Sequence, residues 1–269
     1  METNSLFKYF ILSLIITLIL VIILSRTKDE FFYDVKEINP DLEKIDSIKT
    51  EIYDEMLKVY NKKSWEDWPE KNLYNKNGQW KILPFYAFDT WVKENCDSCP
   101  KIYKFLKSIK GLKSAMLSKL SPKMKLNPHR GWGRYSNYII HCHYGILVPE
   151  GCYVSVSNRN KPPLFKSFTS GESKGFFKKE KVKSKTSGEN IVYDEFDRKE
   201  EIRFHQQFKW LCFDDSKTHY AENTSNSDRI VLLLDIERPL NIAVGTSAEG
   251  DTEELTAIIN YYKSKNIKI

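Results

Sequence analysis

Histidine and cysteine are both scarce in this sequence, with five of each among 269 residues. Cys96 and Cys99 are separated by two residues, and three interpretations stay open for them: a redox pair, a disulfide, or a loop before Pro100 in which one cysteine packs as a small hydrophobe. A structural zinc site would need two further ligands at suitable spacing, and the sequence lacks them. The remaining cysteines, at an odd total, are Cys142, Cys152 and Cys212.

A large charge excess of one sign is also missing. The 42 basic and 36 acidic residues give a net charge of +6, and much of the excess lies in one internal segment. Such a modest balance gives no overall signal for nucleic-acid binding, so no nucleic-acid partner is expected. The 41% hydrophobic and 13% aromatic content is sufficient to bury a core.

Long helical periodicity is absent after Ala115, where short strands and turns follow one another. This pattern predicts a mainly β core. Residues 135–148 alternate with a period of two, which places His141 and His143 on the same strand face. Two histidines on the inner wall of a barrel would build a polar pocket, although a solvated face with incidental histidines is the alternative.

One long hydrophobic run is present at the amino terminus, where Ser13 and Thr17 are the only interruptions between Phe10 and Leu24. Its length predicts a transmembrane signal anchor over residues 6–25. A cleaved signal peptide is the competing interpretation, but the run ends without a convincing small-residue cleavage site.

Residues 26–72 are charged and are predicted to form a juxtamembrane helical spacer. Ile48, Ile52, Met56 and Tyr60 recur at helical spacing, which favours packing on a neighbouring domain. At the other end of the chain, residues 243–269 are predicted to supply a helix that packs on the outside of the domain.

A basic insertion is predicted at residues 160–205, where a lysine-rich stretch is followed by an acidic run. A solvated flexible loop is the first interpretation. A lid, or a docking surface for an acidic protein or membrane headgroups, is the second. His205 lies at the edge of this segment and is interpreted as incidental rather than as a ligand.

Several short motifs occur in an informative order: Pro128-His129-Arg130-Gly131, His141-Cys142-His143, Phe213-Asp214-Asp215-Ser216 before His219, and Asp228-Arg229 opening a final apolar strand. In this order they resemble the aspartyl/asparaginyl β-hydroxylase family, over residues 78–239. The resemblance implies a double-stranded β-helix, a jelly-roll or cupin-like core with flanking helices, within a catalytic domain at residues 73–242.

The resemblance implies a mononuclear Fe(II) site held by His129 and His219. Most related iron oxygenases add a carboxylate two residues after the first histidine. Here that position is Gly131, as in this family. Asp214 and Asp215 could supply a carboxylate to the metal, but their place in the turn favours bracing of the His219 loop.

The resemblance also implies a site for 2-oxoglutarate. Arg229 matches the family's carboxylate-binding arginine, and Ser118 and His143 match two further contacts. The family carries an arginine where this chain has His141, which removes a permanent charge and predicts weaker or more pH-dependent binding. Arg134 is a candidate to compensate. Arg229, with the two histidines of the metal site, completes the predicted catalytic set.

The implied activity is that of an Fe(II)- and 2-oxoglutarate-dependent dioxygenase that uses O2, with ascorbate as a possible reductant, and hydroxylates a substrate carbon. The β-carbon of Asp or Asn in a protein or peptide is the expected target. A lipid or small-molecule hydroxylase, and a non-catalytic membrane-tethered binding protein, are the alternatives. A nuclease or zinc hydrolase lacks the required ligands here. The family further implies a type II membrane protein with its catalytic domain in the lumen of the endoplasmic reticulum or Golgi.

Overall fold

The structure is a computed structural model, and it describes residues 3–24, 27–62, 65–74, 80–158, 180–183, 190–193 and 199–265. Its helices are α1 (Thr3–Leu24), α2 (Val35–Ile38), η1 (Pro40–Ile48), α3 (Lys49–Tyr60), η2 (Lys71–Leu73), α4 (Lys93–Ser98), α5 (Pro100–Lys107), α6 (Gly133–Ser136) and α7 (Glu253–Lys265). The strands of the amino-terminal half are β1 (Phe32–Tyr33), β2 (Glu66–Asp67), β3 (Trp80–Ala87), β4 (Thr90–Trp91), β5 (Leu112–Leu120), β6 (Met124–Lys125) and β7 (Ile139–Leu147). The later strands are β8 (Cys152–Ser157), β9 (Glu180–Lys183), β10 (Asn190–Tyr193), β11 (Lys199–Phe204), β12 (Trp210–Phe213), β13 (Thr218–Asn223) and β14 (Arg229–Glu237).

Within these described ranges the strands form two antiparallel sheets. The larger has the order β1-β12-β7-β14-β5-β3-β2, with β4 paired to β3, and the smaller has the order β6-β13-β8-β11-β10-β9. Many neighbouring strands, such as β7 and β14 or β8 and β13, are distant in sequence, so the chain crosses repeatedly between the two sheets, as in a jelly roll. The predicted mainly β core with flanking helices is therefore confirmed.

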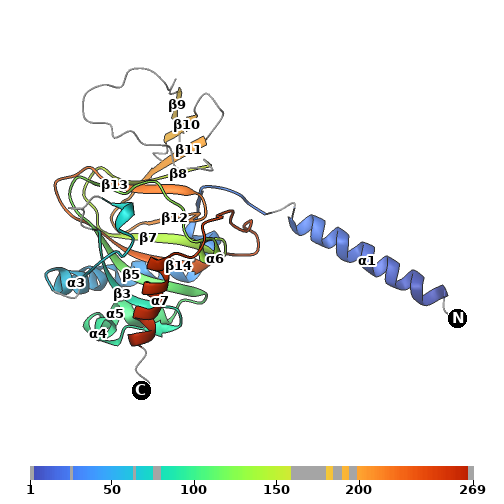
Figure 1. Cartoon of the computed structure of the whole chain (residues 1–269), viewed down its shortest axis with the longest axis horizontal. Coiled ribbons are helices and arrows are strands. Elements are labelled where there is room, and N and C mark those ends of the chain that lie inside the picture. Colours follow the sequence, from blue (N-terminus) through green and yellow to red (C-terminus); the bar gives the residue numbers. More distant parts are fainter. Residues whose placement is uncertain are drawn as a thin grey trace.

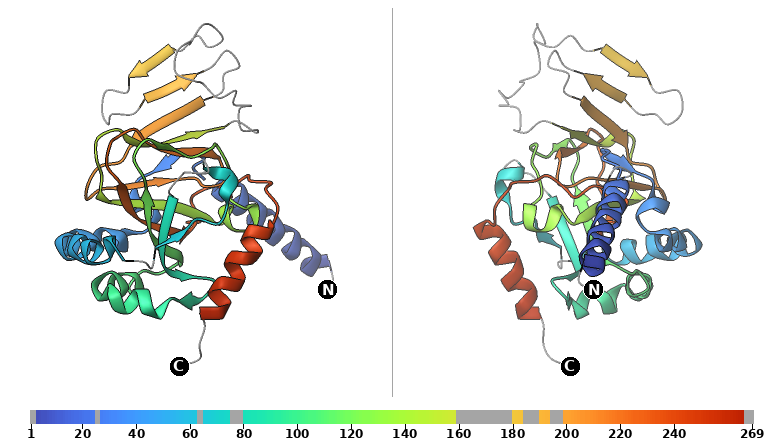
Figure 2. Two further views of the ribbon diagram at one scale, coloured as in Figure 1. Left: turned by 60° about the vertical axis from the view of Figure 1, so that its left-hand side comes forward. Right: turned by 90° about the vertical axis from the view of Figure 1, so that its right-hand side faces the viewer.

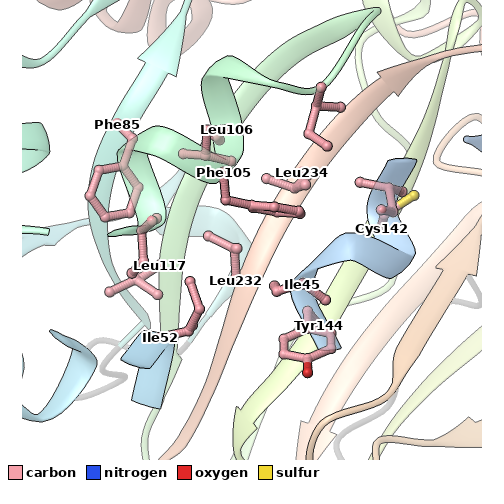
Figure 3. Packing of buried hydrophobic residues seen from close by; sticks show 14 of the residues in the cluster. Ile45, Ile52, Phe85, Phe105, Leu106, Leu117, Cys142, Tyr144, Leu232 and Leu234 are labelled. Carbon is pink, nitrogen blue, oxygen red and sulfur yellow. The ribbon is translucent and has the colours of Figure 1, made fainter. Parts of the chain in front are cut away.

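The larger sheet has two different faces because side chains alternate along each strand. On the outer face, Leu232 and Leu234 of β14 pack with Leu117 of β5 under α3 and α5 (Figure 3). Fully burying each such aliphatic side chain stabilises the fold by roughly 1.5–3 kcal/mol. On the inner face, β14 presents Arg229 and Asp235 instead, toward the smaller sheet. The fold thus separates an apolar core from an internal polar cavity.

Residues 26–72 were predicted to be a juxtamembrane helical spacer whose helical stripe packs on a neighbouring domain. The helical stripe exists, but Ile52 and Met56 are fully buried in the main core. The carboxylate of Glu55 accepts the backbone N–H groups of Lys101 at 2.8 Å and Ile102 at 2.9 Å. These donors at the start of α5 have no partner within their own helix, so Glu55 caps it from α3. The segment belongs to the folded body.

The predicted amino-terminal anchor falls on α1, which extends away from the rest of the molecule (Figure 1). Crossing a bilayer requires about 20 consecutive apolar residues. Lys8, Ser13 and Thr17 interrupt the run of apolar residues within this helix. In the part of the chain that the structure describes, no helix combines sufficient length and apolarity to cross a membrane. The structure therefore corrects the prediction of a transmembrane helix at residues 6–25. The lumenal location stays a prediction.

The predicted insertion at residues 160–205 lies largely outside the described residues. Its described parts are not a simple loop, because β9 and β10 form a hairpin that pairs onto β11, and β11 pairs onto β8. These strands continue the smaller sheet beyond the body (Figure 2). Its carboxyl-terminal end is therefore anchored to the core sheet through β11.

All five cysteines are free and buried. Cys96 and Cys99, for which a disulfide was one interpretation, pack with the apolar core. The thiol of Cys96 faces the carbonyl of Phe85 at 3.7 Å. Burial raises the pKa of both thiols to about 12, so both stay protonated at neutral pH. The packed alternative is the one that the structure shows.

Candidate active site

A cavity of about 960 Å³ lies between the two sheets. The larger sheet contributes the inner face of β5, β7 and β14, and the smaller sheet contributes β13 and one residue of β8. Every site residue proposed from sequence lines it: Ser118, His129, His141, His143, His219 and Arg229. Residues from well-separated parts of the chain therefore share one chamber.

His129 and His219 face each other across a two-residue backbone bridge. The N–H of each residue donates to the carbonyl of the other, at 3.0 and 2.9 Å, and their ring centroids are 4.4 Å apart. The Nδ1 atom of His129 lies 2.7 Å from the carbonyl of Asn127, and that of His219 lies 2.9 Å from the carbonyl of Lys217. Because a carbonyl can only accept, both rings carry their proton on Nδ1 and keep an Nε2 lone pair.

Both rings are also neutral at neutral pH. Burial, together with the neighbouring His219, lowers the pKa of His129 to about 3, and burial lowers the pKa of His219 to about 4. A neutral imidazole with a free Nε2 is the form that binds divalent transition metals. The pair therefore fits a metal such as Fe(II).

Asp215 fills the place next to this pair that Gly131 leaves free. A Cβ atom added at Gly131 would lie 1.8 Å from Oδ2 of Asp215, and Oδ1 of Asp215 lies 3.4 Å from Nε2 of His219. Burial raises the pKa of Asp215 against the opposing attraction of His141. A side chain at position 131 and the Asp215 carboxylate exclude each other, so the glycine makes room for this carboxylate.

Asp214 holds the turn before His219 in place, a role that was predicted for both Asp214 and Asp215. It is buried, and it accepts two hydrogen bonds from the guanidinium of Arg238, at 2.7 and 3.0 Å. It also accepts from the backbone N–H and hydroxyl of Ser216. Burial alone would raise the pKa of Asp214, but Arg238 and Ser216 hold it below its usual value. The turn that presents His219 is fixed by this pair.

Arg229 is a buried cation at another part of the cavity. Its side chain is 2% exposed, and Nη2 lies 3.4 Å from the hydroxyl of Ser118, which also accepts the indole N–H of Trp80 at 3.0 Å. Burial lowers the pKa of Arg229 to about 10, so the group stays charged at neutral pH. In the described residues Nε and Nη1 of Arg229 have no hydrogen-bond partner. Unpaired donors on a buried cation fit an incoming carboxylate.

His141 forms a pair with Asp235 on the neighbouring strand. Its Nδ1 lies 2.6 Å from Oδ1 of Asp235, whose Oδ2 accepts the hydroxyl of Ser114 at 2.5 Å. Burial opposes the charged ring, but Asp235 outweighs it and raises the pKa of His141. The ring can therefore carry some of the positive charge that an arginine would have carried. Arg134 does not pair with this group: it is exposed and pairs with Asp251 at 3.2 Å.

His143 is stacked on His205, which sequence reasoning had dismissed. The rings are 5.3 Å apart at an angle of 12°, and Nδ1 of His143 lies 3.0 Å from Nε2 of His205. His205 directly follows β11, which pairs with β8 in a register that places Phe204 opposite Tyr153. That register is not visible in the sequence, so no local signal could have found His205.

The rest of the cavity wall is mainly apolar. Ile82, Met116 and Leu233 line it from the larger sheet, next to the stacked rings of Trp68 and Trp80. The helix α7 closes one side with six residues, among them Ile258, Tyr261 and Tyr262. The carboxyl-terminal helix, which was predicted to pack outside the barrel, is part of the cavity wall.

These features define the class: a two-sheet β protein whose internal cavity brings together a neutral histidine pair and a buried arginine. No group of three or more His, Cys, Asp or Glu suited to a metal occurs among the described residues. The chain belongs to the aspartyl/asparaginyl β-hydroxylase family, whose sequence profile matches residues 46–162 and 194–239. The interruption of this match falls inside the predicted insertion.

Two relatives agree with this assignment. The ornithine lipid ester-linked acyl 2-hydroxylase of Rhizobium tropici is 24% identical over 162 residues, 60% of this chain and 43% of that protein. The aspartate β-hydroxylase domain-containing protein 2 of Rattus norvegicus is 31% identical over 86 residues, 30% of this chain and 24% of that protein. The chain thus spans less than half the length of these relatives.

Solved structures show a weaker likeness. A non-heme α-ketoglutarate-dependent epimerase from nogalamycin biosynthesis has a TM-score of 0.37 and 11% identity, covering 83% of this chain and 89% of that one. A 2OG-Fe(II) oxygenase-family oxidoreductase from Burkholderia pseudomallei has a TM-score of 0.34 and 7% identity, covering 66% and 76%. The assignment therefore rests on the family match and on the topology.

Proposed function

We propose that this protein is an Fe(II)- and 2-oxoglutarate-dependent dioxygenase that hydroxylates a carbon atom of its substrate. The observation that carries the proposal is the buried, charged Arg229, whose unpaired N–H donors share a cavity with the neutral pair His129 and His219. An uncompensated buried cation is unfavourable unless an anion reaches it. A dicarboxylic acid that also meets the metal satisfies both parts of the cavity.

Each part of the cavity has a distinct role in this proposal. His129 and His219 hold the iron through Nε2, and their backbone bridge fixes the distance between them. Arg229 and Ser118 bind the distal carboxylate of 2-oxoglutarate, with His143 beside them. His141, with its raised pKa, stabilises negative charge near the metal.

Iron bound there would activate O2 and so couple the oxidative decarboxylation of 2-oxoglutarate, which gives succinate and CO2, to hydroxylation of a substrate carbon. The protein orients the two co-substrates and excludes water through the apolar wall of the cavity. Ascorbate serves as a reductant for the metal. The non-catalytic binding protein remains as the alternative that a turnover assay decides.

The proposed substrate is an Asp or Asn residue of a protein or peptide, hydroxylated at its β-carbon, as the family name indicates. A second candidate is a lipid acyl chain. It is favoured by the apolar side of the cavity, formed by Ile82, Met116 and Leu233, and by the name of the relative from Rhizobium tropici. The cavity exceeds what 2-oxoglutarate alone occupies, so either substrate can extend toward α7.

The test is succinate formation from 2-oxoglutarate by the full-length protein with Fe(II), O2 and ascorbate. Turnover should require iron and disappear in His129→Ala and in Arg229→Ala. Lys93→Ala is the matched control, since Lys93 is exposed and pairs only with Asp97 on the surface of α4. Adding Asp- and Asn-containing peptides or acylated lipids then shows which substrate accelerates turnover.

A folded, iron-loaded protein that forms no succinate with any of these substrates would exclude the dioxygenase and favour the binding protein. Iron content should be measured in each variant, because His129→Ala is expected to lose the metal and Arg229→Ala to retain it. Loss of metal in both variants would contradict the separate roles given to the two residues.

A further inference from the structure

His205 is a buried histidine that the proposed chemistry does not use. It is 7% exposed and lies directly after β11, where its backbone N–H donates to the carbonyl of Cys152 at 2.9 Å. It does not line the cavity, whereas His143, on which it stacks, does. The stack on His143 is therefore a direct ring contact between His205 and a residue of the cavity wall.

The contact between the two rings requires one proton. Burial lowers the pKa of both imidazoles well below the usual value, helped at His143 by His141 and at His205 by Arg229, so both rings are neutral. A neutral imidazole has one N–H donor and one acceptor nitrogen. At 3.0 Å, either His143 donates Nδ1–H to Nε2 of His205, or His205 donates Nε2–H to Nδ1 of His143.

The two arrangements leave different atoms without partners. Among the described residues, Nε2 of His143 and Nδ1 of His205 are both buried and unpaired. If His143 donates, Nδ1–H of His205 becomes a buried donor with no acceptor, and a lone pair of His143 remains unpaired. If His205 donates, the unpaired atom of His205 is an acceptor, and His143 keeps an Nε2–H donor. Each arrangement leaves one orphan donor and one orphan acceptor, but only in the second does the donor belong to His143, which lines the cavity and can meet an acceptor there. Because an orphan donor without any acceptor is costly, this favours the second arrangement.

The second arrangement also suits the charge of the expected ligand. Unpaired N–H groups of Arg229 share the cavity with His143, so a carboxylate bound there meets donors and not a lone pair. We propose that His205 is a positioning residue that donates Nε2–H to His143, fixing His143 as the Nε2–H tautomer that donates to the carboxylate of 2-oxoglutarate. The identity of the carboxylate rests on the proposed function, whereas the tautomer does not.

The tautomer can be read directly from histidine 15N NMR spectra of the metal-free protein. The chain has only five histidines, so single substitutions assign the signals. His143 should be protonated at Nε2 in the wild type and in His205→Gln, whose amide retains a donor. In His205→Leu, which has no donor, His143 should become a mixture of tautomers. A wild-type His143 protonated at Nδ1 would overturn the proposal.

Binding supplies the second readout, measured by calorimetry with Mn(II) in place of iron and without O2. Losing a hydrogen bond to a charged group should raise the Kd for 2-oxoglutarate about 10-fold in His205→Leu. His205→Gln should restore it, which a packing role alone would not produce. Equal Kd values for wild type and His205→Leu would overturn the proposal. If the wild type shows the expected tautomer but binds no 2-oxoglutarate, the proposed function fails while the relation between His205 and His143 stands.

Discussion

Gly131→Ala is expected to disturb the metal site through one methyl group. The added carbon would lie 1.8 Å from Oδ2 of Asp215 and 2.7 Å from Cβ of Ser136. The backbone cannot move aside easily, because the N–H of Gly131 donates to the carbonyl of Asp215 at 3.0 Å and its carbonyl accepts from the hydroxyls of Ser136 and Ser247. The Asp215 carboxylate must therefore leave its position beside His219.

The size of this effect follows from the overlap. Inserting a methyl group into a filled site typically destabilises a protein by about 1–3 kcal/mol. For a domain of this size each kcal/mol lowers the Tm by about 2–4 °C. Gly131→Ala should therefore melt roughly 2–12 °C below the wild type. Gly250→Ala is the matched control, since an added Cβ there meets no atom within 4 Å, and its Tm should be unchanged.

The cause can be separated from a general packing defect by a double-mutant cycle. Asp215→Ala removes the carboxylate that the new methyl group meets, so Gly131→Ala should be less destabilising in that background. The coupling energy should be about 1 kcal/mol or more, in the range measured for directly contacting residues. Differential scanning calorimetry of the four proteins gives this value. Additive effects would refute the argument that Gly131 makes room for Asp215.

Two further predictions concern stability. Arg238→Met should lower the free energy of unfolding in urea by about 3–5 kcal/mol, because the buried Asp214 carboxylate loses both hydrogen bonds from the guanidinium and retains only the longer ion pair with Lys217 at 3.9 Å and the hydrogen bonds from Ser216. Arg134→Met, which removes the exposed pair with Asp251 and the contact with the Tyr135 ring, should change it by less than about 1 kcal/mol. Similar losses in the two variants would contradict this. Acid should destabilise the metal-free protein. Burial lowers the pKa of His219 to about 4 in the folded protein, whereas a value of about 6.5 is expected in the unfolded chain. As the pH falls below about 6.5, only the unfolded chain therefore takes up this proton. This residue alone should reduce stability by up to about 1.4 kcal/mol per pH unit between those values, and a flat profile of urea midpoints between pH 7 and pH 5 would argue against a neutral ring.

Much of the site could be predicted because strand periodicity is a local property. Alternation across β7 placed His141 and His143 on one face, and the structure finds both in the cavity. The helical stripe of Ile48, Ile52, Met56 and Tyr60 likewise predicted a packed helix. The order of short motifs, through the family resemblance, predicted that His129 and His219 lie together, although no local pattern relates two residues so distant in sequence.

What could not be predicted depends on strand register and on neighbours in space. Asp214 and Asp215 are adjacent in one turn, and only the position of Arg238 assigns the first to bracing and leaves the second beside His219. His205 follows a segment with no recognisable pattern, and only the pairing of β11 with β8 carries it to His143. The sequence of residues 26–72 shows charge but not the contact of Glu55 with α5.

The backbone bridge between His129 and His219 has a consequence for how this chain can change in length. The antiparallel bridge joins His129 to His219, so the chain between them begins and ends at one pair of hydrogen-bonded residues. Each doubling of a flexible loop adds only about 0.6 kcal/mol to its closure. Segments can therefore be gained or lost between the strands of the smaller sheet, as between β8 and β11, without altering the spacing of the two rings. Variation in length at this point gives the protein a region that can diversify while the site is preserved.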